Sequence, residues 1–349
     1  MVHQGALLCG LRSQGRCELY IKRMQVKRYG WMVVGFGAVG FSAWLLYHEL
    51  QGLSLDELWE SLVAISGASW LLCGLATVAA YAALAGYDHL ALRHLGRRIS
   101  WTYKTVTSFT TYALSHNIGA SVFSGSIVRY RAYSAKGLSA AEVGVLVAFC
   151  SFTFVLGVIL LTGLVLIFQP NVAERFIDVL PLEASSLSGL FLLSLVGLYI
   201  LGSALTFKPL RIGNFSIYYP RLSIAAWQLL IGPMEIVAAG AIVYFALPEA
   251  GNPGFFTVMG IFLIAFSLAL LSHAPGGLGV LEIAFITGLP EMDSADILAA
   301  LLVFRLLYLL LPLAAALFVV LGFERQQLQH DARSVPLDPG SSQKSVHPL

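Results

Sequence analysis

The chain contains few charged residues. Asp, Glu, Lys and Arg make up 11% of its 349 residues, whereas an ordinary soluble domain carries about 25%. Hydrophobic types make up 58% of the chain, and the mean hydropathy is +0.79. This composition excludes a water-soluble globular fold. The net charge of +2 points to no partner, because the charges are segregated along the chain.

Several motifs of soluble chemistry are missing from the sequence. It has no phosphate-binding GxxxxGK[ST] motif, which excludes that kind of ATP-driven motor, and it has no HExxH or GxSxG. The four cysteines form no metal-type CxxC motif, and we interpret them as reduced or inert. We therefore expect no metal, no other cofactor and no nucleic-acid partner.

Long apolar runs fill most of the chain. A membrane-spanning helix needs about 20 apolar residues and satisfies its own backbone groups in lipid. The sequence therefore predicts an all-α integral membrane protein with six full transmembrane helices. The first is uncleaved, because no small-residue cleavage site follows it. The six runs are 30–48, 68–87, 140–168, 187–206, 223–247 and 297–322.

The basic residues indicate the orientation in the membrane, because cytoplasmic loops are enriched in Lys and Arg. We predict that both termini are cytoplasmic. A basic tail would precede a polytopic domain over 30–322, and a disordered polar tail would follow it. Apart from Arg175 and Arg305, every Lys and Arg falls in five segments: 1–29, 88–105, 125–139, 207–222 and 323–349.

Two segments do not fit a simple crossing. Both flanks of 106–124 are basic, so this Ser- and Thr-rich segment must enter and leave from the cytoplasmic side. Segment 254–290 has neutral or acidic flanks and is interrupted at Pro275, Gly276 and Gly277, so it must dip in from outside. We predict two re-entrant or broken-helix elements, which are tolerated only inside protein or beside a water-filled cavity.

The two broken elements share a short sequence pattern. Residues 115–119 read SHNIG and residues 272–276 read SHAPG. Broken segments of opposite orientation are typical of inverted-repeat transporters with a midplane site, although chance similarity between common residues stays open. We expect His116 and Asn117 to hydrogen-bond freed peptide groups. Tight turns and close packing are expected of Gly119, Pro275, Gly276, Gly277 and Gly279.

Three charged residues lie inside apolar segments, namely Glu235, Glu282 and Arg305. Each costs about 2.5–3.5 kcal/mol on insertion scales, and such residues usually face a cavity or a partner. Two interpretations stay open. The residues form a structural ion pair that holds helices together, or they form a polar site for a charged ligand.

Three more charged residues flank the first broken element. Arg129 and Arg131 follow it closely, and their planar guanidinium groups suit a phosphate. Ordinary cytoplasmic enrichment in arginine explains them equally well. Asp88 ends the second span and is interpreted either as a helix-end carboxylate or as a ligand.

A set of motifs extends over roughly 30–322 and resembles one known membrane family. The set includes YDHLA at 87–91, ALSHNIG at 113–119, VRYRAYS at 128–134, PGGLGVLE at 275–282 and FRLLY at 304–308. Together with the mid-helix Glu235, these motifs resemble the membrane region of the lysylphosphatidylglycerol synthase/flippase family, the multiple peptide resistance factors.

The resemblance implies a lipid flippase in a bacterial cytoplasmic membrane. Full-length family members also carry a synthase domain that transfers an amino acid from aminoacyl-tRNA to phosphatidylglycerol. Their membrane region is held to flip the product outward, which repels cationic antimicrobial peptides. Since this chain stops after the last matched helix, we predict a non-enzymatic translocator of phosphatidylglycerol, aminoacyl-phosphatidylglycerol or a related phospholipid.

The resemblance also suggests roles for the charged residues. Arg129 and Arg131 would contact the phosphate, and Arg305 would pair with an acid. Glu235 and Glu282 would face a headgroup amine or take part in proton coupling. Two alternatives stay open, as does homo-oligomerisation: a secondary transporter of another small or lipid-linked substrate, and a non-catalytic membrane partner of a separate synthase.

Overall fold

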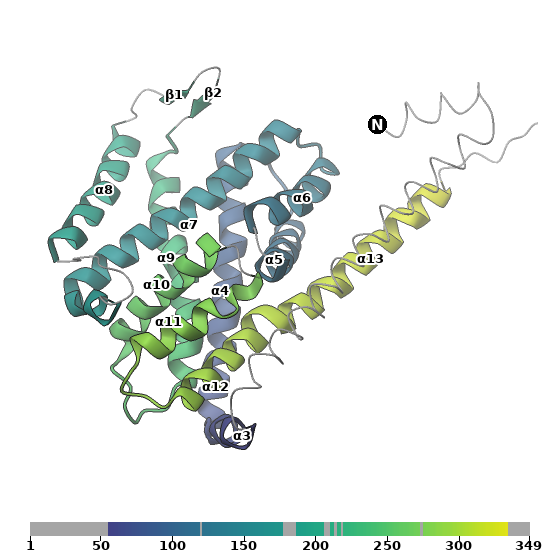
Figure 1. Ribbon diagram of the computed structural model, residues 1–349. Helices are drawn as coiled ribbons and strands as arrows, with labels where there is room; N and C mark the ends of the chain where they lie inside the picture. Colours follow the sequence, from purple (N-terminus) through teal and green to yellow (C-terminus); the bar gives the residue numbers. More distant parts are fainter. Residues whose placement is uncertain are drawn as a thin grey trace, which may run out of the picture.

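The protein is helical almost throughout the described part of the chain (Figure 1). The predicted first span 30–48, the N-terminal tail and Gly119 lie outside that part. The computed structural model describes residues 55–118, 121–176, 186–205, 210–212, 215–217, 219–272 and 275–333.

Five helical stretches in the described residues are long and apolar enough to cross a membrane. They coincide with the last five predicted apolar runs. Four are single helices: α4 (Gly67–His94), α7 (Ala140–Phe168), α8 (Ser186–Ala204) and α9 (Leu222–Ala246). The fifth stretch, Ser294–Gly322, combines α12 (Ser294–Phe304), a π-helical turn η3 (Arg305–Leu310) and the start of α13 (Leu311–Arg333).

Helix α13 continues past the predicted end of the last span. Figure 1 shows it projecting away from the helix bundle, and it ends at Arg333. The sequence analysis placed a disordered tail from 323 onward, which is wrong for 323–333. The residues there include Glu, Arg and Gln, which have high helix propensity and can prolong a helix already nucleated in the membrane.

Paired helices occupy the position of the first predicted broken element. Helix α5 (Trp101–Ile118) and helix α6 (Ser121–Ser134) pack against each other, and α5 also contacts α4 and α13. Neither is among the helices suited to cross a membrane.

The second predicted broken element consists of α10 (Phe255–Ser272), a 3-10 turn η2 (Pro275–Gly277) and α11 (Val280–Gly288). Gly276, Gly277 and Gly279 have φ angles of 61°, 67° and 76°. Residues with a side chain rarely adopt this left-handed backbone, which gives a physical reason for glycine at the turn.

Two short strands interrupt a segment that the sequence analysis treated as a loop. Strand β1 (Leu210–Ile212) pairs antiparallel with β2 (Phe215–Ile217), with Leu210 opposite Ile217. Two stretches that alternate apolar and polar residues, LRI and FSI, are separated by Gly213-Asn214 and carry a hairpin signal that was overlooked. The all-α prediction is therefore incomplete at this point.

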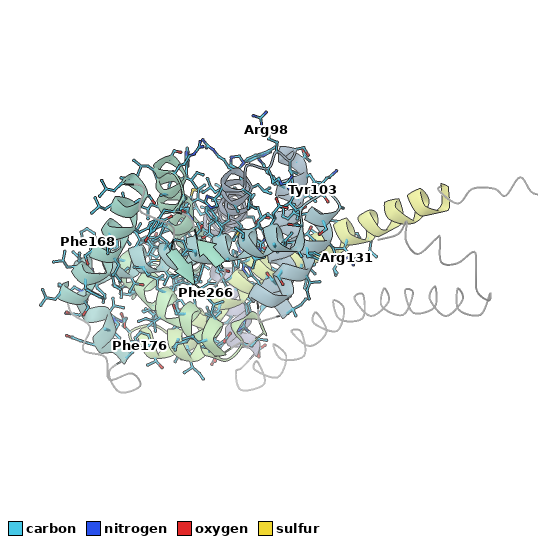
Figure 2. All side chains as sticks on the ribbon, turned by 90° about the horizontal axis from the view of Figure 1, so that it is seen from above. Arg98, Tyr103, Arg131, Phe168, Phe176 and Phe266 are labelled. Carbon is cyan, nitrogen blue, oxygen red and sulfur yellow. The ribbon has the colours of Figure 1, made fainter. Side chains whose placement is uncertain are left out.

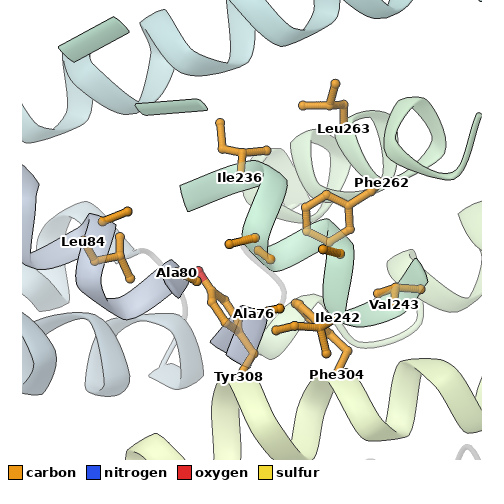
Figure 3. Packing of buried hydrophobic residues seen from close by; sticks show 14 of the residues in the cluster. Ala76, Ala80, Leu84, Ile236, Ile242, Val243, Phe262, Leu263, Phe304 and Tyr308 are labelled. Atoms are coloured by element: carbon orange, nitrogen blue, oxygen red, sulfur yellow. The ribbon is translucent and has the colours of Figure 1, made fainter. Parts of the chain in front are cut away.

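Helices α4 and α9 lie side by side at the centre of the bundle. Ala76 and Ala80 of α4 are small, buried side chains that lie near the aromatic ring of Tyr308 (Figure 3). Close packing of this kind is how membrane helices associate without a hydrophobic driving force. Helix α3 (Leu55–Ala64), with which the described residues begin, packs against α12.

Candidate functional site

A buried ion pair joins α4 to α6. Nη2 of Arg129 lies 2.7 Å from Oδ1 of Asp88, and Nε of Arg129 donates to the same oxygen at 3.2 Å. The hydroxyl of Tyr133 donates to Oδ2 of Asp88 at 2.6 Å. Asp88 is 0% exposed and Arg129 is 4% exposed. Water is excluded from this pair, so each charge depends on its protein partners.

The helix-end interpretation of Asp88 is wrong. Helix α4 continues to His94, so Asp88 lies inside the helix rather than at its end. Its carboxylate also lies 3.6 Å from the sulfur of Cys150 in α7. Asp88 therefore ties α4 to α6 and lies against α7.

Arg129 and Arg131 do not share one site. Arg129 is buried, with its guanidinium group 4.7 Å from the centre of the Tyr112 ring. Arg131 is exposed, because residues two apart on a helix face different directions. Figure 2 shows Arg131 and Arg98 at the edge of the molecule, with Arg98 projecting away from it.

A second buried ion pair joins α11 to η3. A guanidinium nitrogen of Arg305 contacts a carboxylate oxygen of Glu282, and both side chains are about 6% exposed. Glu282 lies in the first turn of α11, where the helix dipole favours an acid. Of the two acids considered as partners for Arg305, Glu282 is the one that the structure places in contact.

Glu235, in the middle of α9, has a different environment. It is 2% exposed, and its Oε1 accepts a hydrogen bond of 2.6 Å from the hydroxyl of Tyr308. Its second oxygen, Oε2, is buried without a hydrogen-bond partner among the described residues. Tyr308 lies three residues after Arg305 in the same π-helical turn, so Glu235 and the Glu282–Arg305 pair meet the same segment.

Aromatic rings connect the first ion pair to Glu235. The ring of Tyr112, beside Arg129, lies 5.6 Å from the ring of His116. His116 in turn stacks on Tyr308 at 5.4 Å, with an angle of 22° between the rings. Contacts therefore run without interruption from Asp88 to Glu235 through side chains of α6, α5 and η3.

Asn117 fixes the end of α5 to the same π-helical turn. Its amide nitrogen donates to the carbonyl of Leu309 at 3.1 Å and to the carbonyl of Ala113 at 2.8 Å. The bond to Leu309 joins the end of α5 to the backbone of another element. His116 contributes its ring, and its buried Nδ1 has no hydrogen-bond partner in the described part of the chain.

The sequence analysis included Tyr133 and Tyr308 only as members of the family motifs and assigned neither of them a role in the site. Tyr133 lies four residues after Arg129, and Tyr308 lies three residues after Arg305. A tyrosine one helical turn from an intramembrane arginine would have been a usable signal, because such spacing places both on one face. A further buried link was also missed: Gln228 in α9 donates to Thr153 at 2.7 Å and accepts from Tyr199 at 2.5 Å.

The described residues contain no group of three or more His, Cys, Asp or Glu side chains placed to hold a metal ion. The site is instead a layer of paired charges and aromatic rings between helices.

No family model matches the sequence. The chain is 30% identical over 290 residues to the inner membrane protein YbhN of Escherichia coli, and the alignment covers 81% of this chain and 88% of that protein. The chain belongs to the family of YbhN-like inner membrane proteins. It is therefore a multi-pass inner membrane protein. The chain is also 32% identical over 257 residues to an uncharacterised protein of Synechocystis, and that alignment covers 72% of this chain and 79% of the relative.

A more distant similarity extends to phosphatidylglycerol lysyltransferases. The chain is 26% identical over 295 residues to the Staphylococcus haemolyticus protein and 24% identical over 285 residues to a Staphylococcus aureus protein. The two alignments cover 81% and 80% of this chain but 33% and 32% of those proteins. The chain thus matches about a third of the length of each lysyltransferase.

Proposed function

We propose that this protein is a non-catalytic translocator that moves an anionic or aminoacylated phospholipid across the inner membrane, with both termini in the cytoplasm. Two findings support a lipid-related role. The chain belongs to an inner membrane family, and most of it aligns with part of the phosphatidylglycerol lysyltransferases. The buried Asp88–Arg129 pair carries the more specific proposal.

The ion pair fits the charges of an aminoacylated headgroup. Such a headgroup carries a phosphate, which suits the guanidinium group of Arg129, and an ammonium group, which suits the carboxylate of Asp88. Removing one partner of a buried pair typically costs about 3–5 kcal/mol. A ligand that replaces both partners avoids leaving an unpaired charge. A purely anionic headgroup would satisfy Arg129 alone, so the aminoacylated lipid is the better match.

The broken helices provide a route in this proposal. The pair α5 and α6 would enter from the cytoplasmic side, and α10, η2 and α11 would enter from outside, as two re-entrant elements related by an inverted repeat. Asn117 and Arg305 bring both elements to η3. A headgroup that leaves the first ion pair would then meet Glu282 and Arg305, while exposed Arg131 would attract anionic lipid at the cytoplasmic surface.

Lipid movement can be measured with the full-length protein in vesicles. Fluorescent lysyl-phosphatidylglycerol in the inner leaflet becomes accessible to a membrane-impermeant quencher only after it has crossed. We expect the wild-type protein to accelerate crossing and Arg129→Gln to slow it by a factor of ten or more. Arg98→Gln, which removes an exposed arginine, should behave as wild type. A wild-type rate equal to that of empty vesicles would refute translocation.

Two other outcomes would redirect the proposal. Ion-driven uptake of a water-soluble or polyprenyl-linked substrate, without lipid crossing, would identify a secondary transporter. A deletion strain that loses synthesis of the aminoacyl lipid, rather than its appearance in the outer leaflet, would identify a partner of a separate synthase.

A further inference from the structure

Among the buried acids of the described residues, Glu235 differs in having no ion pair there. Asp88 is held by Arg129, and Glu282 by Arg305. Within the described residues, the carboxyl group of Glu235 has the Tyr308 hydroxyl on Oε1 and no hydrogen-bond partner on Oε2, although it is only 2% exposed. A carboxylate in such a place lacks the compensation that both other acids have.

The groups that the structure describes around Glu235 supply no positive charge in contact with it. From α4, the hydroxyl of Tyr81 donates to the backbone carbonyl of Tyr308, and the neutral hydroxyl of Tyr87 lies beside both the Gly232 carbonyl and the carboxyl group of Glu235. From η3 comes Tyr308, with Arg305 in the same turn but bound to Glu282.

The remaining neighbours of α9 add no cation at Glu235 in the described part of the chain. From helix α5, the ring of His116 stacks on the ring of Tyr308. The polar groups of α7 and α8 that meet α9, Thr153 and Tyr199, contact Gln228 instead. Helices α10 and α12 present apolar side chains to this part of the core (Figure 3), including Phe262, Leu263 and Phe304.

We propose that Glu235 is the proton-binding site of a proton-coupled translocator, an inference that rests on the function proposed above. In one state the carboxyl group carries a proton taken from water on one side of the membrane. In the other state it releases that proton to water on the opposite side. The balanced step is the loss of one proton and the gain of one negative charge on Glu235. No other reactant is required.

Tyr308 connects this step to the lipid site. Its hydroxyl bonds Glu235, its ring stacks on His116, and Arg305 lies three residues before it in η3. Proton loss places a negative charge beside this turn, which also contains the cation Arg305. The guanidinium group of Arg305 could then pair with either Glu282 or Glu235. Its transfer from Glu282 to Glu235 would leave the Glu282 carboxylate available to bind the ammonium group of the lipid. A π-helical turn suits such a change, because these turns are frequent at functional sites and hold looser hydrogen bonds.

Infrared spectroscopy of the purified full-length protein tests proton binding without any transport. A protonated carboxyl group in the membrane region has a carbonyl stretching band that ionised carboxylates lack. We expect this band in the wild-type protein at neutral pH, its loss in Glu235→Gln, and its retention in Glu282→Gln. A wild-type spectrum without the band, or a band that survives in Glu235→Gln, would overturn the proposal even if the protein moves lipid.

A vesicle assay tests the coupling. An imposed pH gradient should accelerate lipid crossing by wild type severalfold, and Glu235→Gln should cross at a rate independent of the gradient. Glu249→Gln, which changes an exposed acid just after α9, should respond as wild type does. Acceleration by a sodium gradient alone, or none by either gradient, would refute proton coupling while leaving translocation intact. If no lipid crosses, translocation itself fails and the infrared result alone decides whether Glu235 binds a proton.

Discussion

The hydroxyl of Tyr81 in α4 donates a hydrogen bond of 3.0 Å to the backbone carbonyl of Tyr308 in η3. Pro312 gives the physical reason. Proline has no N–H group, so one backbone carbonyl in the preceding turn loses its helical donor. The backbone bonds of this turn run five residues back, as from Leu311 to Leu306, and a carbonyl at this depth needs a partner because lipid offers none. Tyr81 supplies the donor and holds the irregular turn against α4.

We therefore expect Tyr81→Phe to destabilise the protein by about 1 kcal/mol, the usual contribution of one hydrogen bond. In a Pro312→Ala background the restored N–H group allows regular backbone bonds to form in this turn, so the same substitution should cost less. Thermal unfolding of the four proteins in detergent measures this difference. Equal losses in both backgrounds would show that Tyr81 acts through its packing rather than through this bond.

The Asp88–Arg129 pair should behave as a coupled unit. Asp88→Asn leaves a buried arginine without its carboxylate, and Arg129→Gln leaves a buried carboxylate, so each should destabilise by about 3–5 kcal/mol. The double variant should be more stable than the sum of the two losses implies, because neither charge remains. Unfolding midpoints at matched detergent concentration provide the comparison. Additive losses would contradict a direct ion pair.

The crossing of α7 and α9 should not tolerate a side chain at Gly157. A Cβ atom there would lie 2.7 Å from the backbone carbon of Gly232. We expect Gly157→Val to cost about 1–3 kcal/mol or more through overpacking. Gly144 lies on the same helix with open space around it, so Gly144→Ala is the matched control. It should be neutral or slightly stabilising, because alanine is the better helix former by about 1 kcal/mol. Similar behaviour of the two variants would contradict close packing.

The proposed orientation can be tested by cysteine labelling in intact cells. With Cys9 and Cys17 changed to serine, the described cysteines Cys73 and Cys150 are both buried. A membrane-impermeant maleimide should label Glu249→Cys from outside, and it should label Arg98→Cys only after the membrane is opened. Both positions are exposed, so a difference in labelling reports the side of the membrane. The reverse pattern would place the termini outside.

The number and position of the five described spans follow from hydropathy, because each span needs a long apolar run whatever its neighbours are. The break at 275–279 also follows from local sequence, since proline and glycine limit or permit backbone conformations on their own. The hairpin of β1 and β2 carried a local signal as well. The end of α13 did not follow from hydropathy, because this helix continues through polar residues beyond the apolar span.

Local sequence also identified Glu235, Glu282 and Arg305 as costly residues in the membrane. It did not determine which of them meet. Asp88 and Arg129 are 41 residues apart, and Glu235 and Tyr308 are 73 apart. Such pairs form only when α4, α6, α9 and η3 pack together, and hydropathy contains no information about the rotation of each helix. The tertiary structure therefore decided that Asp88 holds Arg129, that Glu282 holds Arg305, and that Glu235 faces a tyrosine.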